Sequence, residues 1–262
     1  MKIQFLGTGS AFSTKNYHSN LLLTENKSSM LIDAGTDIRH ALTRCNLSAK
    51  DIEAVYVSHA HADHAGGIEY LATMSIIGPR RLPIQLFCQK ELTDSLWNNT
   101  WKGGLRFSAR KLMQLDDYFF INKIKLKEPF FWQGIEFNIV PALHIFTMDQ
   151  RLFSYGVMIH VLDNDKKIFI TSDTLFTPDY LEDYYNEADI IIHDCETNGL
   201  QTGIHAHYNE LRTLPDETKR KMLLWHYQDN VINNMKDWQQ RAKGDGFRGM
   251  AEPLQVIDIA KM

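Results

Sequence analysis

The sequence predicts a protein of the α/β class, because short strand-like runs alternate with helical segments along its 262 residues. Residues 2–6 alternate polar and apolar side chains, which is the pattern of a half-buried strand. Ala54–Val57 carries no charge and is typical of a strand buried on both faces. This length is enough for one large core, so we expect residues 1–262 to form a single domain.

Charge and composition restrict the classes of function. The 28 Lys and Arg against 32 Asp and Glu give a net charge of −4, which argues against a wide basic face for long nucleic acid. No apolar run approaches the ~18–20 residues that cross a bilayer, so we expect no membrane association. Cys45, Cys88 and Cys195 show no CxxC spacing, and no signal-peptide pattern opens the sequence. We therefore expect a cytoplasmic protein without disulfides.

The order of elements follows from apolar runs, helical periodicity and turn residues. Strands are expected at 2–6, 20–24, 29–32, 54–57, 84–88, in several pieces over 119–140, and at 153–162, 167–171, 189–193, 223–227 and 254–259. Helices are expected at 37–45, 65–77, 89–97 and 178–186, with a further helical stretch after 207.

Two segments leave their roles open. Gly78-Pro79 should end the helix 65–77, and the following Arg80-Arg81 is either a phosphate contact or a solvated pair. Residues 97–118 mix Trp and Phe with Lys and Arg. They could form a lid that offers stacking and charge to a nucleotide, or they could be an ordinary packed loop.

The strongest chemical signal is His-Ala-His-Ala-Asp-His at residues 59–64, directly after the strand Ala54–Val57. In an extended segment His59 and His61 point the same way, because side chains alternate with period two. Asp63 and His64 follow at the turn into a helix and can address a second metal. Imidazole nitrogen and carboxylate oxygen suit zinc, manganese or iron rather than calcium. The alternative is a polar helix start with histidines in solvent.

This motif resembles the signature of the metallo-β-lactamase superfamily. The resemblance implies a four-layer αββα sandwich and a hydrolytic site with two transition-metal ions, zinc first and manganese as the alternative. In order along the chain, it also implies metal ligands beyond the motif: His144, Asp173 as a bridging carboxylate, and His226. Asp33, after the second strand of the first hairpin, would support the histidines through hydrogen bonds.

The resemblance extends to the ribonuclease Z-like branch through Gly7-Thr8-Gly9-Ser10 and the segment 193–197. Within 193–197, an aspartate and a cysteine replace the branch's glutamate and alanine. The resemblance to this branch implies that His205, oriented by Asp194, protonates the leaving ribose oxygen, while Asp63 orients the metal-activated hydroxide. His207, two residues later, is the rival acid.

No long basic arm for tRNA is recognisable, so we expect a small nucleotide substrate. The resemblance is closest to small phosphodiesterases, including phage anti-Pycsar enzymes that cleave cyclic nucleotides, and related enzymes imply a homodimer. The alternatives are a tRNA 3′-processing endoribonuclease, a thioester or lactone hydrolase of the same fold, and a non-catalytic metal-binding protein.

Overall fold

The computed structural model describes residues 1–77, 83–109 and 111–262. The chain divides into two compact units. The first unit contains residues 1–7, 17–126 and 254–262, and the second contains residues 8–16 and 127–253. Within the described residues, each unit is built on one seven-stranded sheet. Whether residues 1–262 act as the expected single domain stays a prediction.

The sheet of the first unit has the strand order β14-β1-β2-β3-β4-β5-β6. Its strands are β1 (Lys2–Phe5), β2 (Leu21–Glu25), β3 (Ser28–Ile32), β4 (Ala54–Val57), β5 (Ile84–Gln89), β6 (Phe119–Ile124) and β14 (Val256–Asp258). Pairing is antiparallel from β14 to β3 and parallel from β3 to β6. The expected apolar run forms β4, which is buried along its whole length because it lies among parallel neighbours.

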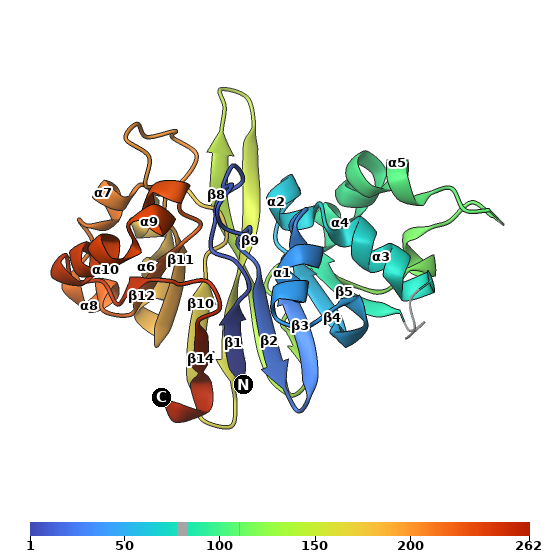
Figure 1. Cartoon of the computed structure of the whole chain (residues 1–262), viewed down its shortest axis with the longest axis horizontal. Helices are drawn as coiled ribbons and strands as arrows, with labels where there is room; N and C mark the ends of the chain where they lie inside the picture. Colours follow the sequence, from blue (N-terminus) through green and yellow to red (C-terminus); the bar gives the residue numbers. More distant parts are fainter. Residues whose placement is uncertain (78–82, 110) are drawn as a thin grey trace. The chain divides into compact units, whose positions relative to one another are not determined.

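Helices of the first unit pack beside this sheet, as α1, α3 and α4 show in Figure 1. They are α1 (Ile38–Arg44), α2 (Ala62–Ala65), α3 (Ile68–Ile77), α4 (Lys90–Leu96) and α5 (Lys102–Leu105), with a π-helical turn at Trp97–Trp101. Leu31 and Val55, on neighbouring strands, share one apolar cluster with Leu42 of α1 and Leu71 of α3. That cluster is the core that fixes the strand ends where the histidine motif begins.

The second unit has the strand order β13-β12-β11-β10-β9-β8-β7. Its strands are β7 (Phe130–Trp132), β8 (Ile135–Phe146), β9 (Arg151–Val161), β10 (Lys166–Ile170), β11 (Ile190–Asp194), β12 (Met222–Trp225) and β13 (Gly249–Met250). Its helices are α6 (Pro178–Glu187), α7 (Tyr208–Leu211), α8 (Asp216–Lys219), α9 (Asp229–Asn233) and α10 (Met235–Gly244). Phe169, Ile191 and Leu224 of adjacent strands form the core with helical residues such as Leu181.

The helix expected at 65–77 is divided in the structure. It begins at Ala62 and breaks at Gly66-Gly67, before α3. The N–H of Gly67 donates to the carbonyl of Ala34 at 2.8 Å, and a Cβ on Gly67 would lie 2.3 Å from the carbonyl oxygen of Gly35. The break lets the loop after β3 approach the helix start, and it places Asp63 and His64 inside the short helix α2. The following residues Gly78-Pro79 and Arg80-Arg81 lie outside the described residues.

The large aromatic residues of 97–118, apart from Phe107, are buried, although most of the other described residues there are exposed. Trp101 is 1% exposed and its Nε1–H donates to the Ala65 carbonyl at 3.0 Å, while Trp97 and Tyr118 are also buried. Trp97, Trp101 and Tyr118 therefore complete the core of the first unit and offer no stacking face, whereas a lid formed by other residues of 97–118 stays a prediction. Phe107 is exposed, and Arg110 lies outside the described residues.

Candidate metal centre

The motif at residues 59–64, hereafter the histidine loop, places two pairs of ligand atoms in the first unit. His59 Nε2 lies 3.1 Å from His61 Nδ1. His64 Nε2 lies 3.2 Å from Asp63 Oδ2. His61 is extended, with φ −67° and ψ 149°, and it precedes α2. The period-two argument for His59 and His61 therefore agrees with the local geometry.

Asp33 holds the histidine loop from the end of β3. Its carboxylate accepts hydrogen bonds from the N–H of Ser58 at 2.8 Å, from the Ser58 hydroxyl at 2.7 Å and from His64 Nδ1 at 2.7 Å. The Ser58 oxygen in turn lies 3.0 Å from His59 Nδ1. Because both Nδ1 atoms are hydrogen-bonded, His59 and His64 present Nε2 as the ligand atom. The supporting hydrogen bonds expected of Asp33 are present.

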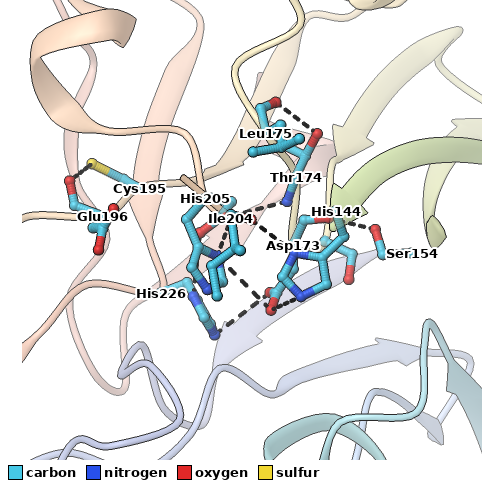
Figure 2. Close-up of polar contacts among 12 residues, drawn as sticks. His144, Ser154, Asp173, Thr174, Leu175, Cys195, Glu196, Ile204, His205 and His226 are labelled. Atoms are coloured by element: carbon cyan, nitrogen blue, oxygen red, sulfur yellow. Dashed lines mark hydrogen bonds and ion pairs between the residues drawn. The ribbon is translucent and has the colours of Figure 1, made fainter. Parts of the chain in front are cut away.

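His144, at a register shift within β8, converges with Asp173 after β10 and His226 after β12 (Figure 2). His144 Nδ1 donates to the carbonyl of Ile204 at 2.9 Å, so its Nε2 faces Asp173. That Nε2 lies 3.5 Å from Asp173 Oδ2, whereas His226 Nε2 lies 3.5 Å from Asp173 Oδ1. The two imidazoles thus approach different oxygens of one buried carboxylate, as the ligands of a bridging aspartate would.

Asp194 connects His205 and His226 from the end of β11. Its Oδ2 accepts from His205 Nδ1 at 2.8 Å and from the N–H of Thr174 at 2.9 Å. Its Oδ1 lies 3.2 Å from His226 Nδ1. Burial raises the pKa of Asp194, but the charge and hydrogen bond of His205, together with His226, lower it to about 2. The Asp194 carboxylate is therefore charged at neutral pH. Its contact with His226 was not anticipated from the sequence.

The contact between Asp194 and His205 also sets the protonation of His205. Burial lowers the pKa of His205, but the charge and hydrogen bond of Asp194 outweigh it and raise the pKa above its usual value. Since Nδ1 donates to Asp194, Nε2 is the atom that can hold a proton for another molecule. Figure 2 shows His205 near His144 and His226, and ring centroids lie 5.0 Å from each.

His207 is engaged differently from His205. Its Nε2 donates to the carbonyl of Asn198 at 2.9 Å, and its Nδ1 accepts from the N–H of Asn209 at 3.2 Å. With both ring nitrogens bonded to backbone, the imidazole caps α7 and has no proton to offer. The geometry favours His205 over His207 as a proton donor.

The donor atoms fit a transition metal. Ligands ~2.0–2.1 Å from a tetrahedral zinc ion lie roughly 3.3 Å apart. The four pairs described above lie 3.1, 3.2, 3.5 and 3.5 Å apart, within one unit in every case. Asp173, Asp194, His205 and His226 also bring ligand atoms within 4.8 Å of one another. Buried imidazoles whose Nδ1 atoms are held by oxygen acceptors are typical metal ligands.

Comparison with known proteins agrees with this geometry. The family described as "Anti-Pycsar protein Apyc1" matches residues 1–257. The chain belongs to this Anti-Pycsar Apyc1 family. The Apyc1 protein of Bacillus phage vB_BsuM-Goe3 is 33% identical over 243 residues, covering 88% of this chain and 90% of the relative.

Solved structures similar to this Apyc1 family member establish the fold. YhfI from Bacillus subtilis, a metallo-β-lactamase fold protein, aligns with a TM-score of 0.73 at 18% identity, covering 98% of both chains. The short form of human tRNase Z aligns with a TM-score of 0.69 at 20% identity, covering 99% of both chains. The expected metallo-β-lactamase-like α/β sandwich is confirmed. Together, family membership and the His/Asp cluster support a metal-dependent hydrolase with a phosphodiesterase-like function.

One negative observation concerns membranes. Within residues 1–77, 83–109 and 111–262, no helix combines the length and the apolar character needed to cross a bilayer.

Proposed function

We propose that this chain is a dinuclear metal-dependent phosphodiesterase that hydrolyses cyclic nucleotides or similar small phosphodiesters. The observation that carries the proposal is the pair of 3.5 Å approaches of His144 and His226 to the two oxygens of Asp173. A carboxylate addressed in this way favours two metal ions over one. The phosphodiester class is supported by membership of the Anti-Pycsar family.

The proposed ligands follow the order of the superfamily pattern. One metal would be held by His59, His61 and His144 and the other by Asp63, His64 and His226, and Asp173 would be shared between them. Zinc is the expected metal and manganese the alternative. When bound, the metal ions supply Lewis acidity that activates a water molecule and offsets charge on the phosphoryl group.

The chain's own residues supply orientation and a proton. Asp63 accepts a hydrogen bond from the attacking water and aims it at phosphorus. His205 gives its Nε2 proton to the departing ribose oxygen, while Asp194 holds the ring through Nδ1 and favours the protonated form. Asp194 is thus a positioning residue.

A small substrate is preferred over tRNA. The net charge of −4 provides no general attraction for a long polyanion. The fold is shared with tRNase Z, so a tRNA 3′-processing activity is the alternative to exclude, followed by thioester or lactone hydrolysis. The relatives named for anti-Pycsar activity favour a small nucleotide.

The decisive experiment combines metal analysis with a substrate panel. After metal-replete purification, elemental analysis should give about two metal ions per chain, and 3′,5′-cyclic nucleotides should be cleaved far faster than a tRNA precursor. Asp173→Asn should abolish cleavage, whereas His160→Gln, at an exposed His–Asp pair with Asp165, should not. Efficient tRNA trimming without cyclic-nucleotide cleavage would reverse the assignment.

The proposed acid has its own signature. His205→Ala should lower cyclic-nucleotide hydrolysis by ~10²–10⁴-fold, and hydrolysis of bis-p-nitrophenyl phosphate much less, because p-nitrophenolate leaves without a proton. His207→Ala is the matched comparison. A leaving-group-dependent defect in that variant alone would transfer the role to His207.

The proposal includes a homodimer, as expected from related phosphodiesterases. Light scattering should give twice the chain mass of 30.3 kDa. A monomer at micromolar concentration would remove this part of the proposal and leave the chemistry unaffected.

A further inference from the structure

A pocket of about 490 Å³ lies beside His205 in the second unit. Its walls come from three segments: residues 10–13, residues 196–205 and residues 228–230 at the start of α9. Its volume falls in the range of small-ligand sites, roughly 300–1,000 Å³. Phe12 lines it and is 92% exposed, which is unusual for a phenyl ring and leaves a flat face available.

The loop that carries Phe12 is pinned on both sides of this residue. The N–H of Ser10 donates to the carbonyl of Tyr227 at 3.1 Å. The N–H and hydroxyl of Thr14 donate to Asp229 Oδ2 at 2.9 and 2.7 Å. The ring of Phe12 therefore projects from a loop that is already ordered, so stacking a ligand on it requires little further loss of conformational freedom.

Gln228 gives the pocket an oriented donor. Its Oε1 accepts from the N–H of Thr197 at 2.6 Å and from the Thr197 hydroxyl at 2.9 Å. A backbone N–H can only donate, so the amide orientation is fixed and Nε2 is the other end. Gln228 is only half-buried, and no described residue accepts a hydrogen bond from its Nε2.

The lining also favours a neutral group over a phosphate. None of the described residues that line the pocket is Lys or Arg. Glu196 is buried, and its oxygens accept from the N–H and hydroxyl of Thr202 and from Asn198 Nδ2. Apart from His205, the lining offers a phosphate no cation that would offset the carboxylates of Glu196 and Asp229, whereas a neutral, planar, hydrogen-bonding group needs none.

We infer that this pocket is the nucleoside subsite of the enzyme, with Phe12 as the stacking face for a nucleobase and Gln228 Nε2 as donor to an acceptor on the base. The inference rests on the proposed function. It places the base and ribose on the side of His205 that faces the pocket, with the phosphate beyond His205. The ligand class is thus a nucleoside unit, for which Phe12 provides affinity and Gln228 provides specificity between bases.

Binding of free nucleosides tests the proposed subsite without requiring catalysis. Adenosine, cytidine, guanosine and uridine would each be tested by saturation-transfer NMR with the zinc-loaded full chain. At least one of the four should bind and receive saturation mainly at its base protons. Phe12→Ala should weaken this binding about tenfold, as expected for one lost base stack. Phe12→Trp should restore it. Phe131→Ala removes another exposed phenylalanine of the second unit, outside the pocket, and should have no effect.

Kinetics provide the second measurement. Phe12→Ala should raise the KM for the cyclic nucleotide about tenfold relative to any change with bis-p-nitrophenyl phosphate, which has no base. Gln228→Glu keeps an acceptor for Thr197 but loses the donor, so it should change the ranking of the four bases. If Phe12→Ala leaves the kinetics of cyclic-nucleotide cleavage unchanged, the subsite is refuted and the proposed function is unaffected. Phe12-dependent nucleoside binding without phosphodiester cleavage would support the subsite and refute the function.

Discussion

At the scale of single residues, hydrogen bonds to imidazole nitrogens determine which ligand atoms are presented. His59, His64 and His144 each engage Nδ1 with an oxygen, from Ser58, Asp33 and Ile204 respectively. Each ring is thereby held in one tautomer and one orientation before any metal arrives. Prearranged nitrogens lower the cost of ordering the ligands when a metal binds.

Asp33→Asn tests this orientation. The amide keeps one acceptor but turns an N–H₂ group toward the donors Ser58 and His64, so we expect metal affinity or activity to fall ~10–100-fold. Elemental analysis and bis-p-nitrophenyl phosphate hydrolysis measure the loss. Asp51→Asn is the control, because Asp51 also accepts from a serine N–H and hydroxyl, those of Ser48, in a capping turn. Equal losses in both variants would show that the effect is only structural.

Asp194→Asn should change the pH dependence of hydrolysis. In the proposed mechanism His205 acts as a protonated donor, so activity should be lost as pH rises through the pKa of His205. Asp194 raises that pKa, so removing the charge lowers it, and the alkaline loss of activity should begin at a lower pH. A pH–rate profile with a cyclic nucleotide measures the shift. Asp189→Asn, which alters an aspartate paired with Lys166, should leave the alkaline limb in place. If the alkaline limb of the pH–rate profile does not shift in Asp194→Asn, protonation of His205 does not control the rate.

At the scale of elements, Asp33, His226 and Ser172, the residue before Asp173, lie in left-handed turns just after strands. Asp33, Ser172 and His226 have φ values of +64°, +55° and +61°, although none is a glycine. They directly or closely follow β3, β10 and β12. Such conformations cost free energy and persist where the surrounding structure fixes them, and they redirect the chain so that its side chains face the site.

The Gly66-Gly67 break between α2 and α3 also contributes to the stability of the fold. Gly67→Ala should lower the free energy of unfolding by about 1–3 kcal/mol, because its Cβ would meet the backbone oxygen of Gly35. Urea denaturation measures the change. Gly103→Ala, in the exposed helix α5 with no atom within 4 Å of the new Cβ, should instead stabilise by up to about 1 kcal/mol. Equal stability of the Gly67 variant and the wild type would show that the loop after β3 can move away.

At the scale of the whole molecule, binding of the proposed metals should stabilise the folded chain. A ligand at a thousandfold excess over Kd stabilises by about 4 kcal/mol, so a chelator should lower Tm by roughly 10 °C. Added zinc should restore Tm. Asp173→Asn should lose most of this response, and His160→Gln should keep it. A chelator-insensitive Tm with full activity would contradict a metal centre.

The histidine loop could be predicted from the sequence because its geometry is local. Four ligands within six residues follow the strand β4, and the period-two alternation alone aligns His59 with His61. Most strands of both sheets were similarly predictable from apolar runs, but β13 was not expected and β8 extends beyond the expected segment 119–140. The boundary of α2 was missed, because its break depends on contact with a loop far away in the sequence.

His205 and His207 are distinguished only by the tertiary structure. The two residues share a type and an extended spacing, so no local pattern separates them. Contacts across the fold do: His205 meets Asp194, while His207 is tied to backbone atoms. The proximity of Phe12 and Gln228 depends on packing in the same way, because 216 positions separate them and their loops are joined by hydrogen bonds to Tyr227 and Asp229. Local periodicity fixes which side chains share a face, but proximity between distant loops depends on the packed core.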